Sequence, residues 1–139
     1  MLPDVRTPAR VMGLYDAPMW ESIERRRMML QRCKTTGTYF YPPGPVSPDC
    51  LEGGWEWTEI SGRGIILSWA IFHRQYLPAY PVPYNVVAVR LEEGPVIISN
   101  LEGDVPDGAW IGYEVLMTYV KMPDGITLPR FKLLRHPGG

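Results

Sequence analysis

Apolar and polar residues alternate along most of the chain after residue 54, and this pattern predicts a series of short β-strands. Turns rich in glycine separate them, such as Ser61-Gly62-Arg63-Gly64. The segments with strand character are 55–60, 65–72, 84–91, 96–101, 113–121 and 127–133. Residues 104–112 carry a proline and two glycines and are expected to form a loop. Five or six strands without a long helix between them predict a mainly β protein built on a small antiparallel barrel, with the OB-fold as the leading candidate.

The first third of the chain has a different pattern. Residues 1–15 show no periodic apolar face and are expected to be an extended arm. Asp16 is expected to cap a short amphipathic helix that begins near Ala17 and Pro18. Residues 28–31 and 38–41 then predict a hairpin. The expected organisation is an arm over 1–15, a helix with a ribbon over 16–53, and an OB-fold domain over 54–139.

Residues 30–57 have the outline of a zinc ribbon in which half of the metal ligands are missing. A ribbon needs two Cys-x-x-Cys knuckles, and here Cys33 and Cys50 remain while Thr36 and Ser47 occupy the other ligand positions. Neutral hydroxyls replace thiolates poorly, so such a site loses much of the roughly 10 to 16 kcal/mol that a closed zinc site supplies. We therefore expect these four positions to be vestigial ligand positions with no tightly bound zinc. His73 and His136 are the candidates for extra ligands if a metal does bind.

Without a metal, the ribbon must be held by apolar burial around the run Tyr39-Phe40-Tyr41-Pro42-Pro43. A disulfide between Cys33 and Cys50 is sterically conceivable in a short hairpin. Two cysteines in a chain that starts without a signal peptide, however, fit a reducing compartment better. Free, disulfide-linked and metal-bound cysteines all stay open at this point.

Composition narrows the class of protein. Glycine and proline are abundant, at 14 and 15 residues, but 45% hydrophobic content argues for a packed chain rather than a disordered one. The net charge of −1 provides no overall field to attract a nucleic-acid backbone. No apolar run approaches the roughly 20 residues that span a bilayer. We expect a cytoplasmic protein that binds neither nucleic acid nor membrane.

Many short motifs occur in an order that resembles one known family. That family joins an N-terminal helix and a rubredoxin-like zinc ribbon to a C-terminal OB-fold, and it has been catalogued as a domain of unknown function. The resemblance covers nearly everything after residue 15. The matching residues are Met19-Trp20, Leu30-Gln31-Arg32-Cys33, Phe40-Tyr41-Pro42-Pro43, Ser47-Pro48-Asp49-Cys50, Trp57-Thr58-Glu59, Ser61-Gly62-Arg63-Gly64, His73-Arg74, Pro83-Tyr84, Leu91-Glu92-Glu93-Gly94-Pro95, Asn100-Leu101 and Thr127-Leu128-Pro129-Arg130-Phe131.

The resemblance implies an accessory subunit of a hetero-oligomer. Its partner would be a thiolase-like or ketosynthase-like subunit that carries the catalytic groups and acts on an acyl-CoA. The small chain would support that partner and help to hold the shared CoA thioester, in carbon–carbon bond formation or cleavage. The residues expected at the CoA or at the interface are Arg32, Lys34, Tyr39, Phe40, Tyr41, Pro42, Arg63, His73 and Arg74.

Several of these residues have a simpler interpretation. The cations in 25–34 could meet CoA phosphates, or they could be solvated charges that favour a helix C-terminus. Arg63 could reach a phosphate from its turn, or remain solvated. His73 has no orienting carboxylate at a diagnostic spacing, which favours a structural histidine and argues against a free-standing enzyme. The main alternative function is binding of single-stranded nucleic acid, with Trp69, Tyr84 and Tyr119 stacking on bases.

Overall fold

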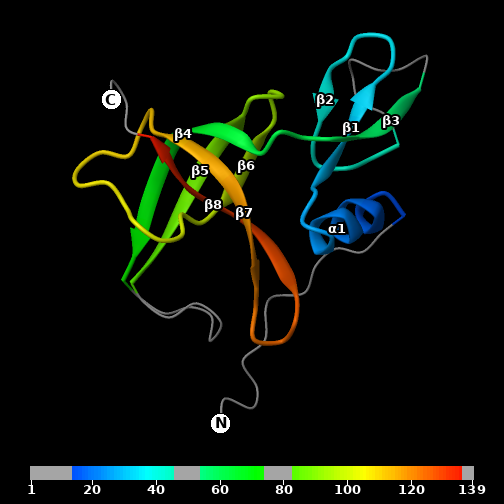
Figure 1. Cartoon of the computed structure of the whole chain (residues 1–139). Helices are drawn as coiled ribbons and strands as arrows, with labels where there is room; N and C mark the ends of the chain where they lie inside the picture. Colours follow the sequence, from blue (N-terminus) through cyan, green and yellow to red (C-terminus); the bar gives the residue numbers. More distant parts are fainter. Residues whose placement is uncertain (1–13, 46–53, 74–82, 136–139) are drawn as a thin grey trace.

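The computed structural model describes residues 14–45, 54–73 and 83–135, with the side chain of Arg135 excepted. These residues form one helix and two antiparallel sheets (Figure 1). The elements are α1 (Asp16–Glu24), β1 (Met29–Cys33), β2 (Tyr39–Phe40), β3 (Trp55–Glu59), β4 (Arg63–Phe72), β5 (Tyr84–Leu91), β6 (Val96–Ser99), β7 (Glu114–Lys121) and β8 (Thr127–Arg135). The mainly β architecture expected from the sequence is confirmed. In the described part, no helix is long and apolar enough to cross a membrane.

The smaller sheet has the strand order β2-β1-β3 and forms the ribbon. Gln31 lies opposite Phe40 on one side and Trp57 on the other. The expected division at residue 54 counted β3 with the barrel, but all five residues of β3 pair with β1. The alternation of polar and apolar residues identified β3 as a strand, yet this pattern does not specify which sheet a strand joins.

The larger sheet has the order β6-β5-β4-β7-β8 and closes into the OB-fold barrel. Closure comes from a parallel bridge between Leu101 and Phe131. The amide of Phe131 donates to the carbonyl of Asn100 at 3.0 Å, and the amide of Glu102 donates to the carbonyl of Phe131 at 2.7 Å. The side chain of Asn85 bonds the backbone of Leu101 through both its amide nitrogen and its amide oxygen. Residues 104–112 contain no helix or strand, as expected.

Gly64 lies at the centre of the barrel wall, paired with Leu91 on one side and Val115 on the other. A Cβ atom there would lie 2.5 Å from Cγ1 of Val89 and 2.8 Å from the carbonyl oxygen of Arg90. Strands β4 and β5 therefore approach each other at a distance that only glycine permits.

Helix α1 starts one residue earlier than expected. Its N-cap is Tyr15 and there is no side-chain cap, so Asp16 lies in the first turn instead of capping it. A carboxylate in the first turn still favours the helix through the macrodipole. Met19 and Ile23 are buried, as the amphipathic pattern predicted, and Trp20 is half-buried against the same core.

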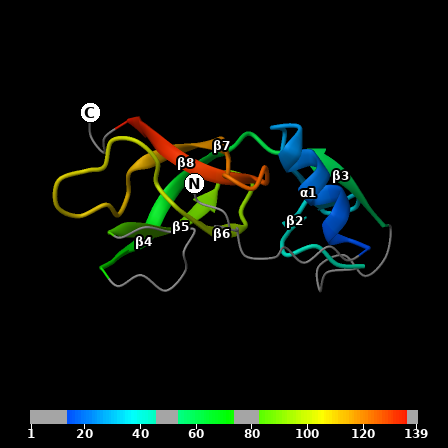
Figure 2. The same ribbon diagram turned by 90° about the horizontal axis from the view of Figure 1, so that it is seen from below.

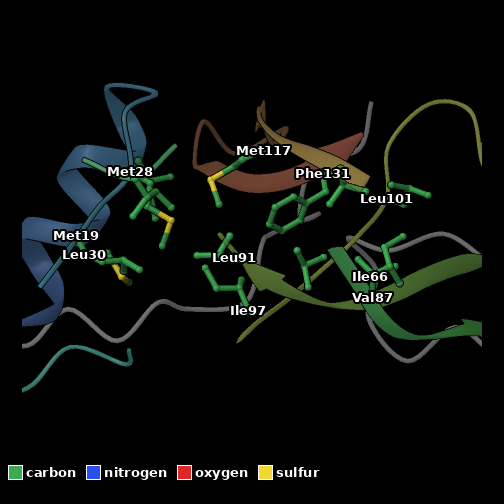
Figure 3. Packing of buried hydrophobic residues seen from close by; sticks show 14 of the residues in the cluster. Met19, Met28, Leu30, Ile66, Val87, Leu91, Ile97, Leu101, Met117 and Phe131 are labelled. Atoms are coloured by element: carbon green, nitrogen blue, oxygen red, sulfur yellow. The ribbon is translucent and has the colours of Figure 1, made fainter. Parts of the chain in front are cut away.

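One hydrophobic core runs from the helix into the barrel. Figure 3 shows Met19, Met28 and Leu30 beside Leu91, Ile97 and Met117, with Phe131, Ile66 and Val87 further inside the barrel. Figure 2 shows α1 and the ribbon together at one end of the barrel. The helix and the ribbon are therefore packed onto the barrel rather than tethered to it.

Polar bonds fasten the same junction. The amide of Met28 donates to the phenol oxygen of Tyr119 at 2.8 Å, and the amide of Thr127 donates to the carboxylate of Glu24 at 3.0 Å. Arg26 donates to the carbonyl of Tyr119 at 3.1 Å. The pKa of Tyr119 is raised, chiefly because the phenol is buried. The bond from Met28 lowers this pKa by less than burial raises it, and the nearby Glu59 carboxylate contributes the smallest rise.

Candidate functional site

The cations expected near residue 32 lie around a polar hollow of about 300 Å³ at the β1–β2 turn. Lys34 and Thr36 line this hollow beside Arg32. The Arg32 guanidinium already donates to the carbonyl of Gly37 at 3.1 Å and lies 5.5 Å from the ring centroid of Tyr39. Arg32 thus joins β1 to the turn and to β2, which gives it a structural role whether or not it also meets a ligand.

The remaining cations of this region are partly engaged. Arg27 forms an ion pair with Glu59 at 2.8 Å, and Arg26 is bonded to the barrel at Tyr119. Both arginines thus contact other parts of the chain, which neither the CoA interpretation nor the solvated one predicted.

The donors at the ribbon turn do not suit zinc. Cys33 is buried and its sulfur belongs to a disulfide, so it is not a thiolate. The Thr36 hydroxyl accepts the amide of Thr38 at 3.2 Å. Among the described residues, no three His, Cys, Asp or Glu side chains are clustered to hold a metal ion. Ser47, Cys50 and His136 lie outside the described residues.

Hydrogen bonds and aromatic contacts join the segments of the ribbon. The buried amide of Gln31 donates to the carbonyl of Gly44 at 2.6 Å and accepts the amide of Gly44 at 2.9 Å. The indole of Trp55 donates to the carbonyl of Pro45 at 2.7 Å. Trp55 also makes edge contacts with Tyr15, Phe40 and Trp57, with ring centroids 5.5 to 6.4 Å apart. Gln31 was not predicted to have this role, and its only sign in the sequence is a polar residue at the end of the expected strand 28–31.

The aromatic run Tyr39-Phe40-Tyr41 is divided between the ribbon and its junction with the barrel. Tyr39 lies beside Arg32, Phe40 packs against Trp55, and Tyr41 lies on a hollow of about 170 Å³ between α1 and the barrel. Burial, and then the Asp16 carboxylate, raise the pKa of Tyr41. Pro42 is exposed beside it.

Arg63 lies on a separate groove of about 470 Å³ in the barrel wall. Arg90 lines the groove with it, and Ile65, Leu67 and Leu134 supply apolar surface. Glu92 and Glu114 are also part of the lining. Arg90 was not predicted as a site residue, and it lies opposite Ile65 on the neighbouring strand. Within the described part of the chain, neither Arg63 nor Arg90 forms an ion pair.

His73 is exposed at the end of β4, and Arg74 lies outside the described residues. In the described part, His73 has no carboxylate partner. The aromatic residues expected to stack on bases are engaged elsewhere. Trp69 stacks on Trp110, Tyr84 stacks on Phe72, and Tyr119 is bonded to Met28. The structure therefore distributes the expected site residues over the ribbon turn, the helix junction, the barrel groove and the end of β4 rather than gathering them.

The described residues thus define a protein class in which a small three-stranded ribbon packs on a five-stranded OB-fold barrel. The family models agree. The "ChsH2, rubredoxin-like zinc ribbon domain" matches residues 20–56, and the "ChsH2, C-terminal OB-fold domain" matches residues 57–120. The chain belongs to the DUF35 family of ribbon and OB-fold proteins, which confirms the resemblance inferred from the sequence.

Three similar proteins illustrate the family. A "DUF35 domain-containing scaffold protein" of Pyrococcus furiosus is 31% identical over 116 residues, which are 78% of this chain and 83% of that protein. A "Probable enoyl-CoA hydratase alpha subunit" of Thermomonospora curvata is 33% identical over 94% of this chain, but the chain spans only 41% of that subunit. A solved structure described as "Ltp2-ChsH2(DUF35) aldolase" contains a chain with 32% identity and a TM-score of 0.82, covering 91% of this chain and 100% of that one.

Proposed function

We propose that this chain is a non-catalytic accessory subunit of an enzyme complex that acts on acyl-CoA thioesters. The observation that carries the proposal is the similarity to the DUF35 chain of an aldolase assembly, at a TM-score of 0.82 over the whole of that chain. The hydratase alpha subunit and the archaeal scaffold protein support the same role. Cys33 is in a disulfide, so its sulfur is not available as a nucleophile.

The partner we propose is a thiolase-like or ketosynthase-like subunit. Such a partner would contribute the nucleophile and the acid–base groups for making or breaking a carbon–carbon bond next to the thioester. The small chain would contribute a folded surface and part of the CoA contact. The complex would therefore be a hetero-oligomer.

The groove at Arg63 and Arg90 is the better candidate for CoA contact than the ribbon turn. Its two guanidinium groups suit phosphate oxygens, and the apolar surface of Ile65, Leu67 and Leu134 suits a pantetheine arm. A groove of about 470 Å³ lies within the usual range of ligand sites. At the ribbon turn, by contrast, Arg32 already bonds Gly37.

The test is co-expression with a thiolase-like protein from the same genome. We expect a stable complex on size-exclusion chromatography and cleavage or condensation of an acyl-CoA by the complex, with none by this chain alone. His73→Ala in the complex should leave turnover unchanged. Absence of a complex with any such protein, together with turnover by the isolated chain that His73→Ala abolishes, would refute the proposal and identify a free-standing enzyme.

The alternative of single-stranded nucleic-acid binding has less support, because Trp69, Tyr84 and Tyr119 already contact other residues. A binding titration with an oligonucleotide at low and high salt separates the two functions. Saturable, salt-sensitive binding abolished by Trp69→Ala would favour the nucleic-acid function.

A further inference from the structure

The loop between β6 and β7 is anchored at both ends, although residues 102–113 form no helix or strand. Its first residue, Glu102, donates its amide to Phe131 and pairs its carboxylate with Arg130 at 3.0 Å. Near its end, the amide of Gly112 donates to the carbonyl of Ile66 at 2.9 Å. Trp110 is buried and stacks on Trp69, with ring centroids 6.0 Å apart and planes 12° apart. This loop is longer than the usual connection of about 4 to 6 residues in compact domains.

The same loop exposes two β-branched apolar side chains. Val105 is 49% exposed and Ile111 is 60% exposed, while Pro106 between them is buried. Asp104 and Asp107 are exposed beside them. The exposed stretch therefore combines apolar surface with two negative charges and contains no cation.

The loop also has a distinctive position. Figures 1 and 2 show it, in yellow, projecting from the end of the barrel opposite to α1 and the ribbon. A contact made by this loop is thus separate from any contact made by the ribbon.

We infer that residues 103–111 form a docking loop for the enzyme subunit of the complex, and that the subunit receives it in an apolar recess bordered by Lys or Arg side chains. Val105 and Ile111 are the apolar anchors, and the two aspartates match the cations at the rim. Because Trp110 and the bonds of Glu102 and Gly112 already hold the loop, little conformational entropy is lost when it binds. The inference rests on the proposed function.

A second copy of this chain is a less suitable occupant. A contact from this loop to a different surface of an identical chain would be heterologous, and such contacts give open chains of molecules unless the rotation closes. A separate enzyme subunit has no such constraint.

The experiment measures the affinity of the full chain for the thiolase-like subunit with which it co-purifies, by surface plasmon resonance at 50 and 300 mM salt. Val105→Ser with Ile111→Ser should weaken binding at least tenfold, mainly through faster dissociation. Asp104→Asn with Asp107→Asn should slow association several-fold at low salt and reduce its salt dependence. The matched control is Val96→Ser, which removes an apolar side chain 41% exposed on β6 and should leave affinity within twofold.

Each outcome decides the inference. Because all four loop side chains are exposed, their variants should unfold at the same urea concentration as the unaltered chain, which excludes misfolding as a cause. A complex that forms equally well with both loop variants overturns the docking loop and leaves the proposed function intact. Failure of the unaltered chain to bind any enzyme subunit overturns both. A homodimer of the free chain that dissociates in Val105→Ser with Ile111→Ser assigns the loop to a second copy instead.

Discussion

Gln31 shows how a single side chain can organise a ribbon that has lost its ligands. Its amide group makes both a donor and an acceptor bond to Gly44, 13 residues away in the chain. Gln31 is fully buried, so an unpaired amide there would be costly. These two bonds hold the segment after β2 against β1 at Gln31. Phe40 on β2 and Trp57 on β3 are the residues opposite Gln31 in the sheet.

Replacing Gln31 tests this role. Gln31→Ala removes two hydrogen bonds and should lower the free energy of unfolding by about 2 kcal/mol. Urea unfolding followed by tryptophan fluorescence gives the value, since Trp55 and Trp57 lie in the same sheet. Lys34→Ala, an exposed change in the same hairpin, is the control and should stay within about 0.5 kcal/mol of the unaltered chain. Equal stability of the two variants would contradict the role of Gln31.

Gly64 carries a second prediction at this scale. The added methyl group of Gly64→Ala would overlap the backbone of Arg90 and the side chain of Val89, so the strands must move apart. We expect a loss of at least about 2 kcal/mol in unfolding free energy. Gly125→Ala serves as a comparison, because its φ of +89° is strained but no atom lies within 4 Å of the added carbon. Gly125→Ala should lose only about 1 kcal/mol of unfolding free energy. A larger loss in Gly125→Ala than in Gly64→Ala would show that β4 and β5 separate easily.

At the scale of elements, strand alternation predicted the barrel well. Every barrel strand expected after residue 60 is present, because half-buried antiparallel strands alternate polar and apolar residues. The alternation does not specify pairing partners, so the sequence pattern did not indicate that β3 pairs with β1. It also does not specify long-range polar contacts such as Tyr119 to Met28, which are 91 residues apart. For the same reason, residues predicted for one site lie in four places, and Arg90 was overlooked.

The ribbon gives a metal prediction at the scale of elements. Bonds from Gln31 and Trp55, with the aromatic contacts of Trp55, already join its segments, and the described donors do not suit zinc. Incubation with a strong chelator should therefore leave the thermal unfolding midpoint unchanged, as measured by circular dichroism. A midpoint several degrees lower, restored by added zinc, would show that the chain depends on metal after all.

The junction between helix and barrel should respond to alkaline pH. The pKa of Tyr119 is raised in the folded chain above the ordinary value of 10.0, so the folded state favours the neutral phenol. The neutral phenol therefore contributes to the free energy of unfolding. This contribution is fully present below pH 10 and is lost as the pH rises from 10 through the folded pKa. Denaturant unfolding at pH 7, 9 and 10.5 measures this loss. The free energy of unfolding should fall between pH 9 and pH 10.5.

Tyr119→Phe separates this effect from other alkaline changes. The variant leaves the amide of Met28 without its acceptor and should lose about 1 to 3 kcal/mol at pH 7. Its further loss above pH 10 should be smaller than that of the unaltered chain, since the phenol is gone. Tyr41, whose pKa is also raised, remains in both proteins and accounts for the residual slope. An identical alkaline slope in both proteins would exclude Tyr119 as its source.

At the scale of the whole molecule, the separation of the ribbon turn from the barrel groove allows two functions to be distinguished. If the groove holds CoA phosphates, Arg63→Glu with Arg90→Glu should raise the Kd of the complex for CoA at least tenfold and leave assembly unchanged, because both side chains lie on the groove. Arg32→Glu with Lys34→Glu changes the charge by the same amount at the ribbon turn, and should weaken assembly instead. Isothermal titration with CoA and mass photometry of the complex measure the two properties separately. If the groove variant binds CoA normally and the ribbon variant does not, the phosphates meet the ribbon turn, and Arg32 has a ligand in addition to Gly37.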